Sequence, residues 1–567
     1  MKKIILSTIM TVLLFFAGCQ NLDLNPLTEG STENWYSNEQ ELTMALNDLY
    51  RGALWYWECN RLFHTDRYSD DWSQRDYIYD WIKDGYNGET GYVESMWLNS
   101  YKAISRANTI LDHLDNAEGN LSDELITQFK GEASFFRAVF YSYLVFLWGD
   151  VPFFTGYLSI DESYELARTD KNVVLQQIYA DFDEAAADLP NSYGDLKRVT
   201  KGAAYAFKAR AAIWMLDWET AAAAAKSCMD LGVYSLHSDF GNLFLTSTRN
   251  SPEYIFTIPR SKELLDNSET VSNMYPRNQG GTAGAQPSWD LFCSFLCTDG
   301  LPIDKSPLYN PKEPFENRDP RCTYTIVKPG TAHLGFIYDP SPAAKTVQNT
   351  TTGAMVTNKD SQINDQYAAY NGLCLKKGAD EEWTDDKATE KSSVIMRYAD
   401  VLLMYAEAKM ELNEIDASVF DAINQVRARA YKCGMAETTK YPAVSETSQA
   451  KLRTIIRTER HMELAWENRR WFDIIRWRLI ETVMNRPLYV WPPKAQILAY
   501  YNNGDYFFPS VLPVIDENGC PDFAPVAATG KIRKIIDRTV ATRQYLLPIP
   551  SKELAINENL KPQNPGY

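Results

Sequence analysis

The chain has 567 residues, and its 74 acidic side chains outnumber 57 basic ones to give a formal net charge of −17. This length is enough for one large or two ordinary domains with a sizeable core. The acidic balance argues against nucleic acid, whose phosphates select basic surfaces, and against close adhesion of the protein surface to anionic lipid.

The first 18 residues have the pattern of a bacterial export signal. A short basic head precedes an apolar run that ends at residue 17 and is too short for a membrane span, which needs about 20 apolar residues. The tetrapeptide Phe16-Ala17-Gly18-Cys19 resembles a lipobox, with Phe16 in place of the usual Leu. The pattern predicts a lipoprotein signal peptide over 1–18 and lipid attachment at Cys19, which would tether the protein to a membrane. The alternative is an ordinary signal peptide with an incidental cysteine.

Long helical periods dominate the next part of the chain, up to residue 250. Alanines recur within one of them, from Ala203 to Ala212, and permit close contact between helices. The pattern favours stacked helical hairpins of tetratricopeptide type, although no clean 34-residue repeat is visible. The predicted helices are 38–54, 94–115, 122–148, 171–189, 200–216 and 218–231.

The composition changes after residue 250, where Gly and Pro interrupt the chain repeatedly. The stretch 251–391 is predicted to be rich in loops, with a strand at 254–258 and a helix near 288–297. Helices return at 393–413, 416–431 and 448–483, and a second loop-rich stretch covers 485–545. The expected fold is therefore mainly α, with helical hairpins, a large loop-rich portion and a few short strands. We expect 19–250 and 251–567 to pack as one globular unit.

Several segments, in order along nearly the whole mature chain, resemble the hallmark segments of the SusD/RagB family. The sequence departs from the family pattern at Asn468, where Gly is common. The matching segments are "WLNSYKAISRANTIL" (97–111), "EASFFRAVFYSYLVFLWGDVPF" (132–153), "NRDPR" (317–321), "RYADVLLMYAEAKMEL" (397–412), "INQVRARA" (423–430), "ERHMELAWENRRWFDIIRW" (459–477) and "LLPIPSKELAINENLKPQNPGY" (546–567).

The resemblance implies a lipoprotein on the cell surface, anchored in the outer membrane of a Bacteroidetes-type bacterium. Members of the family bind a nutrient glycan, or sometimes a peptide, and lie as a lid over a SusC-like TonB-dependent transporter. Their fold combines helical hairpins with a loop-rich part that carries the ligand site. The resemblance implies no enzymatic activity and no cofactor.

Aromatic side chains make up 13% of the residues, and many lie in polar, loop-like segments. In the stretch 70–86, tryptophans and tyrosines alternate with aspartates and an arginine, which suits stacking on sugar rings and hydrogen bonding to hydroxyls. A second candidate loop spans 272–281, and Trp383 is a weaker third option. The alternative for each ring is burial against the helices. The predicted ligand-binding residues are Asp71, Trp72, Arg75, Tyr79, Trp81, Tyr275, Arg277 and Asn278, with Trp72, Trp81 and Tyr275 forming an exposed platform.

Three glutamates, at 459, 463 and 467, fall at i, i+4 spacing and would share one face of a helix. Paired carboxylates are the groups that a glycoside hydrolase needs. Nearly equal numbers of arginines on the same segment favour a structural ion-pair network instead, made with Arg460, Arg470 and Arg476. In that network we expect Arg470 to pair with Glu467 and Asp473.

Metal, cofactor and nucleophile motifs are not found. The five histidines include no H-E-x-x-H motif, and "ADEEWTDDK" (379–387) lacks the regular spacing of a calcium loop. Cys293 and Cys297 are expected to be buried small side chains, not ligands. The sequence does not determine whether the exported chain forms a disulfide.

The function that these features predict is capture of an oligosaccharide or polysaccharide at the cell surface. Three alternatives stay open: a peptide-binding member of the same family, a glycoside hydrolase, and a helical scaffold that binds only proteins. The last would leave the aromatic loops unexplained.

Overall fold

The computed structural model describes residues 35–59, 65–75, 80–194, 197–264, 270–386, 388–502, 507 and 511–567. Among these residues no helix combines the length and the apolar character needed to cross a membrane.

The described chain is mainly helical, and its longest helices cluster before residue 231 and again between 398 and 464. The helices are α2 (Glu39–Leu49), α3 (Tyr56–Cys59), α4 (Gly91–Asp112), α5 (Asp123–Trp148), α6 (Ile160–Glu165), α7 (Lys171–Asp188), α8 (Lys201–Trp214), α9 (Trp218–Asp230), α10 (Trp289–Ser294), α11 (Pro320–Thr325), α12 (Trp383–Asp386), α13 (Tyr398–Glu411), α14 (Ala417–Ala430), α15 (Gln449–Leu464), α16 (Arg470–Arg476), α17 (Ile480–Met484), α18 (Lys494–Asn502), α19 (Ala524–Ala527) and α20 (Ser551–Ile556).

All sheets in the described part of the chain are antiparallel pairs of short strands. The pairs are β1 (Trp72–Gln74) with β5 (Ala285–Pro287), β2 (Val151–Pro152) with β3 (Arg168–Thr169), β4 (Tyr254–Ile258) with β10 (Ser393–Arg397), β6 (Thr331–His333) with β7 (Phe336–Tyr338), β8 (Thr346–Gln348) with β9 (Met355–Thr357), β11 (Pro487–Val490) with β14 (Arg533–Asp537), and β12 (Val514–Ile515) with β13 (Pro521–Asp522).

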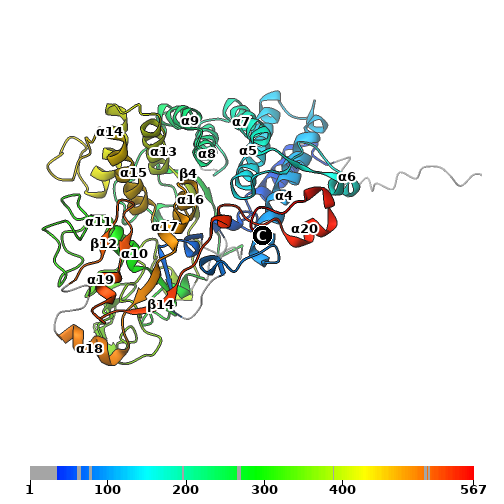
Figure 1. Cartoon of the computed structure of the whole chain (residues 1–567). Helices are drawn as coiled ribbons and strands as arrows, with labels where there is room; N and C mark the ends of the chain where they lie inside the picture. Colours follow the sequence, from blue (N-terminus) through cyan, green and yellow to red (C-terminus); the bar gives the residue numbers. More distant parts are fainter. Residues whose placement is uncertain are drawn as a thin grey trace, which may run out of the picture.

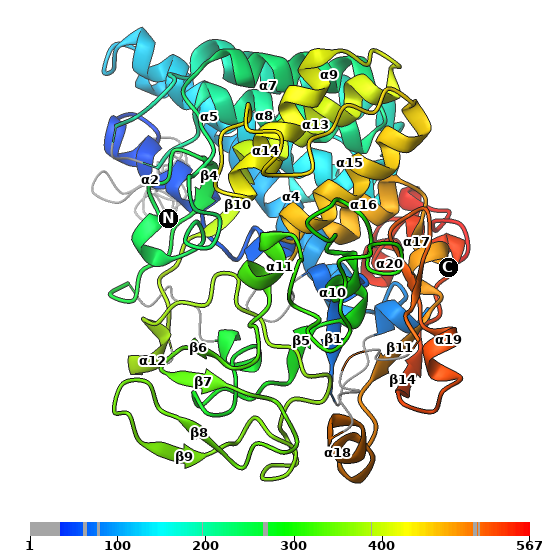
Figure 2. The ribbon, with the colours of Figure 1, turned by 90° about the vertical axis from the view of Figure 1, so that its left-hand side faces the viewer.

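The molecule has a helical layer and a loop-rich part, which lie at opposite ends of the view in Figure 2. In the helical layer, α4, α5, α7, α8 and α9 pack in chain order, each against the next. Helix α13 then packs against α9, α14 and α15, so that the C-terminal helices extend the layer that the N-terminal helices begin (Figure 1). The prediction of a mainly α chain built from helical hairpins is confirmed.

Local sequence explains the bounds and the packing of these helices. Ser122 caps α5 by accepting a hydrogen bond from the backbone N–H of Leu125, and Gly149, with φ of 76°, ends the helix. In α8, the small side chains of Ala204, Ala206 and Ala212 are buried and let neighbouring helices approach closely. One apolar core runs through the whole layer and includes residues from both ends of the chain.

Two predicted helices need correction. Residues 393–397 form the strand β10, which pairs with β4. The predicted helix 448–483 is divided into α15, α16 and α17. Positive φ at Trp466 (59°) and Asn468 (61°) separates α15 from α16, and positive φ at Arg478 (56°) separates α16 from α17. A left-handed residue interrupts an α-helix, and Asn tolerates that conformation better than most residues other than Gly. Asn468 thus takes the backbone conformation for which glycine is suited.

A second apolar cluster lies under the loop-rich part and supports it. It joins Trp72, Trp289, Phe292 and Phe295 to Trp466, at the break after α15. This cluster ties the segment around β1 to the helical layer, and the candidate ligand loops rest on it.

Candidate functional site

The glutamates of α15 belong to a buried ion-pair network. Glu459 and Glu463 are fully buried. Arg321 of α11 donates to both, with Nη1 2.7 Å from Glu459 Oε1 and 3.0 Å from Glu463 Oε2. Arg427 also donates to Glu459, at 2.6 Å. Carboxylates bound in this way cannot flank a sugar ring, so the prediction of a structural ion-pair network is confirmed. Its predicted partners are wrong, because Arg460, Arg470 and Arg476 bind other carboxylates.

The predicted partners of Arg470 are wrong. Glu467 lies in the break after α15, where it accepts hydrogen bonds from Arg397 and Lys377, and Asp473 binds Arg460 and Arg476. Arg470 holds Asp70 instead, with two hydrogen bonds of 2.8 Å. Glu467 thereby shares Arg397 with Glu463 and belongs to the same buried network.

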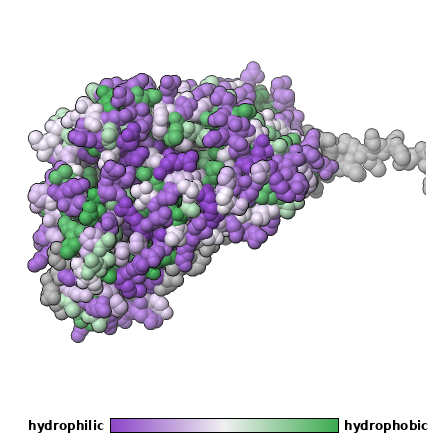
Figure 3. Space-filling view, in the orientation of Figure 1, coloured by the Kyte–Doolittle hydropathy of each residue, from purple (hydrophilic) through white to green (hydrophobic). Residues whose placement is uncertain are grey.

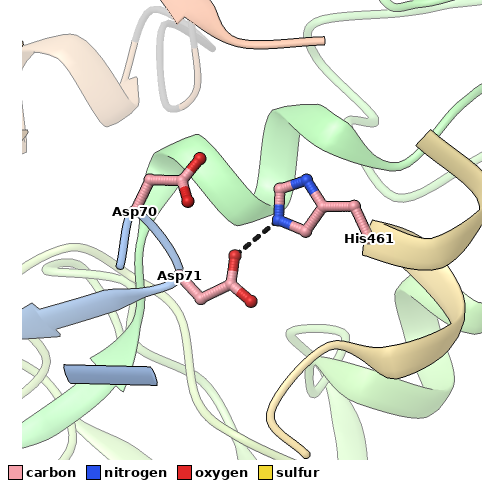
Figure 4. Close-up of side chains that lie close together, drawn as sticks. All are labelled: Asp70, Asp71 and His461. Carbon is pink, nitrogen blue, oxygen red and sulfur yellow. Dashed lines mark hydrogen bonds and ion pairs between the residues drawn. The ribbon is translucent and has the colours of Figure 1, made fainter. Parts of the chain in front are cut away.

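Asp70, Asp71 and His461 come together beneath β1, and all three are buried (Figure 4). Asp71 Oδ1 lies 2.5 Å from His461 Nε2. The three residues can bring one ligand atom each within 4.8 Å of one another. A cation here would have to displace Arg470, which already occupies both oxygens of Asp70, so the arrangement fits a structural anchor better than a metal site.

The electrostatics of this cluster agree with that role. Burial raises the pKa of Asp71, and the nearby carboxylates Asp70 and Asp66 add to that effect against His461. Burial also opposes ionisation of Asp70, but the Arg470 guanidinium outweighs it and holds the pKa of Asp70 below its usual range. Asp71 was predicted to bind ligand; it is fully buried and anchors β1 to α15.

The expected exposed platform is wrong for the two rings that the structure describes. Trp72 is only 5% exposed and stacks on Trp466, with ring centroids 4.6 Å apart. Tyr275 is 2% exposed and meets the buried Trp383 edge to face at 4.6 Å. Burial raises the pKa of Tyr275 above its usual value. These rings pack in small interior clusters because Trp466 and Trp383, distant in sequence, cover them.

The two predicted loops do meet in space. β1 pairs with β5, and the backbone N–H of Arg75 donates to the carbonyl of Gly284 at 3.0 Å. The Arg75 side chain continues the contact, since Nη2 donates to the carbonyls of Ala283 at 2.5 Å and Thr282 at 3.2 Å. Gly281 makes the tight turn possible, because a Cβ there would lie 2.3 Å from the carbonyl oxygen of Tyr275.

An exposed tyrosine, Tyr367, lies where these loops meet. Its side chain is 49% exposed. The guanidinium carbon of Arg75 lies 5.8 Å from the ring centroid, and that of Arg277 lies 5.9 Å from it. Both distances are within the range of cation–π attraction. Asp365 Oδ2 accepts from Arg277 at 2.9 Å, and Asp365 Oδ1 accepts from the backbone N–H of Tyr367 at 2.7 Å. We call Arg75, Arg277, Asp365 and Tyr367 the Tyr367 cluster.

Asn278 holds the loop beside this cluster through hydrogen bonds to its backbone. Its side-chain oxygen accepts from the backbone N–H groups of Lys359 and Asp360, and its Nδ2 donates to the carbonyl of Thr357. The Asp360 carboxylate accepts from the backbone N–H groups of Arg277 and Asn278. Burial raises the pKa of Asp360 to about 6. Asn278 therefore fixes the loop 357–365 in place and has both ends of its amide occupied.

Three predicted residues cannot be placed. Cys19 and Tyr79 lie outside the described residues, and only the backbone of Trp81 is described. Tyr367 and Asp365 were not among the residues predicted from the sequence. Their signal was the segment "DQYAAYNG" (365–372), where two tyrosines and an aspartate stand in a loop-rich stretch.

Seven of the eight cysteines among the described residues are buried. Cys293 and Cys297 pack in the apolar cluster beneath the loops. Burial raises the pKa of both thiols, so the expectation of buried small side chains is confirmed.

Comparison with known proteins decides the family. The model of the SusD family matches residues 249–567, which is more than half of the chain. The chain belongs to the SusD family. A second family model, described as starch-binding associating with outer membrane, matches residues 22–213.

Individual members of the SusD family are similar over most of their length. SusD-like protein P25 of Formosa agariphila is 28% identical, over 72% of this chain and 75% of its own. SusD-like protein P2 of the same organism is 25% identical over 99% of both chains. A SusD-like carbohydrate binding protein of Bacteroides fragilis, solved by crystallography, is 26% identical with a TM-score of 0.76, over 93% of this chain and all of its own.

Proposed function

We propose that this SusD-family chain binds a glycan at the cell surface and does not cleave it. The observation that carries the proposal is the Tyr367 cluster: a half-exposed ring with two guanidinium groups and a carboxylate beside it. The ring offers a stacking face for a sugar, and guanidinium and carboxylate groups beside it can bond hydroxyls. The carbohydrate-binding relative from Bacteroides fragilis supports the same ligand class.

The ring that we assign to ligand stacking differs from those of the sequence-based prediction. Arg75 and Arg277 keep the roles predicted for them, as groups beside the ligand, whereas Tyr367 replaces Trp72 and Tyr275 as the stacking surface. A single exposed ring gives a modest affinity, which suits a protein that must release its ligand again.

The test is calorimetry with the best ligand from a panel of oligosaccharides and peptides. Tyr367→Ala should weaken binding by about 1–3 kcal/mol, as loss of an aromatic anchor does at other interfaces. Tyr157→Ala is the matched control, because Tyr157 is an even more exposed tyrosine beside α6. Wild-type affinity of Tyr367→Ala would place the site elsewhere, and a preference for peptides would reject the glycan.

The remaining part of the proposal concerns location and partner. We propose a lipid on Cys19 that anchors the protein in the outer membrane, and delivery of the glycan to a SusC-like TonB-dependent transporter. The lipobox-like tetrapeptide supports the anchor. So does the match of residues 22–213 to a family described as starch-binding associating with outer membrane.

Metabolic labelling with palmitate tests the anchor directly. The wild type should take up label and stay with the outer-membrane fraction, and Cys19→Ala should lose both properties because the acyl acceptor is its thiol. Label retained on Cys19→Ala would contradict the anchor. Co-purification of the wild type with the transporter tests the partner.

A further inference from the structure

A cavity of about 640 Å³ lies in the loop-rich part, next to α18, and the function proposed above does not use it. Its walls include the aromatic rings of Phe315, Tyr501 and Phe507 and the polar side chains of Asp339 and Ser341. This volume is in the range of small-molecule sites, which combine an apolar surface with a few polar groups.

The charges around the cavity nearly cancel. Lys312 and Lys328 face Glu313, Glu316 and Asp339 along its walls. Lys328 and Glu316 pair with each other. A lining of rings and balanced polar groups fits hydroxyl-bearing, uncharged ligands better than an anion or a cation.

The cavity and the Tyr367 cluster lie on two sides of one loop, 357–365. On one side, Asp360 accepts the backbone N–H of Arg277 at 2.6 Å. On the other side, Asn358 Nδ2 donates to the carbonyl of Asp339 at 2.7 Å, and Ser361 Oγ donates to that of Ser341 at 2.6 Å. Both donors are fully buried, so the loop holds the two places at a fixed separation.

Helix α18 gives a second connection between them. Lys494, at its start, donates to the carbonyl of Ile363 at 2.8 Å, two residues from Asp365 of the Tyr367 cluster. Tyr501 follows seven residues later on α18 and lines the cavity, which corresponds to about 10 Å along the helix axis. The two places are thus connected through opposite ends of α18, so a ligand that contacts both must be a chain and not a single sugar ring.

We propose that the cavity beside Tyr501 is a second saccharide subsite, which holds a further part of the same neutral chain that stacks on Tyr367. The proposal rests on glycan binding at the Tyr367 cluster. Two linked contacts on one ligand make the second contact intramolecular, so affinity rises steeply once the chain is long enough to reach both. The protein then selects long neutral chains over short ones.

The experiment is calorimetry with a length series of the best-binding neutral oligosaccharide, from the disaccharide upward. For the wild type, affinity should rise sharply at one chain length. Tyr501→Ala should weaken binding of longer chains by at least about fivefold and leave shorter chains unchanged. Tyr500→Ala is the matched control, since Tyr500 is the neighbouring tyrosine on α18 and bonds the carbonyl of Gly530 away from the cavity.

Tyr501→Ala could also weaken binding by unfolding α18, so a second set of variants is compared with circular dichroism as a check on the fold. Tyr367→Ala should retain weak binding of long chains, and the double variant with Tyr501→Ala should lose it, with circular dichroism unchanged in both. Equal affinity of Tyr501→Ala and wild type for every chain length overturns the subsite while leaving glycan binding at Tyr367 intact. If no saccharide binds the wild type, the proposed function itself fails.

Discussion

The helical layer and its junction with the loop-rich part are stabilised in different ways. Between α5, α7 and α8, alanine and phenylalanine side chains are buried in one apolar core, which also surrounds the buried ion pair of Arg137 with Asp181. At the junction, charged groups from α11, β10, α14 and α15 meet in the interior, where Arg321, Arg397 and Arg429 all bind Glu463. Apolar packing tolerates the loss of one side chain by partial collapse, whereas a buried charge that loses its partner has no substitute.

This difference has a consequence for function. The loops of the Tyr367 cluster are positioned by the junction through β1, β5 and the buried Asp70–Arg470 and Asp71–His461 contacts. Four predictions test this difference in stabilisation, starting with the largest expected loss.

Glu463→Ala should cause the largest loss. The change leaves three buried guanidinium groups without one of their carboxylates and should lower the free energy of unfolding by about 3–5 kcal/mol. Urea unfolding measures the loss. Lys226→Ala on α9 is the control, because its pair with Asp230 is exposed and should contribute less than about 0.5 kcal/mol. Similar losses for both variants would show that the junction charges are not special.

Trp72→Ala should lower the free energy of unfolding by about 3 kcal/mol, because it removes a buried ring stacked on Trp466 and leaves a cavity. The sequence-based prediction was the reverse, lower ligand affinity with an unchanged fold. Thermal melting of Trp72→Ala, compared with that of Tyr157→Ala, distinguishes a buried Trp72 from a ligand-binding one. An unchanged melting temperature would show that Trp72 is not part of the core.

Arg470→Ala and Asp70→Asn should be strongly coupled. The two side chains share two hydrogen bonds in the interior, so a double-mutant cycle should give an interaction energy of about 2 kcal/mol. The same cycle between Arg470→Ala and Asp473→Asn should give less than about 0.5 kcal/mol, since Asp473 binds other arginines. Coupling to Asp473 and not to Asp70 would restore the partner that the sequence suggested.

Lowering the pH should reduce the stability that the Glu463 carboxylate gives to the junction. The free energy of unfolding should fall by at most about 1.4 kcal/mol per pH unit for this one group. Although burial opposes ionisation of Glu463, the arginines around it hold its pKa below the usual range. A lowered carboxyl pKa gives stability that is present above the unfolded value of about 4.3 and is lost as pH falls toward the folded value.

The stability difference between wild type and Glu463→Gln should therefore be largest near neutral pH and shrink below about pH 4. Urea unfolding of both proteins across this range checks it. The comparison between variants is needed because burial raises the pKa of Asp71 and Asp290, which contribute with the opposite sign. A difference that does not vary with pH would mean that Glu463 is not ionised in the fold.

The sequence by itself determined the features that depend on neighbours in the chain. Helical period, caps such as Ser122 and the glycine at 149 predict α5 within one residue of its observed bounds, because helix hydrogen bonds join residues four apart. The balance of glutamates and arginines after residue 459 predicted that the carboxylates are neutralised in an ion-pair network, but their actual partners, such as Arg321 and Arg427, lie on other elements.

Only the tertiary structure decided which residues meet across the chain. Arg470 binds Asp70, 400 positions away, and Trp72 is covered by Trp466, which the left-handed backbone after α15 directs toward it. Alternating rings and aspartates are equally compatible with a surface and with a buried anchor, so the pattern around Asp71 and Trp72 did not decide their burial. The groups beside the exposed ring of Tyr367 were also decided by the tertiary structure, because Arg75 and Arg277 reach it from loops that sequence spacing does not place together.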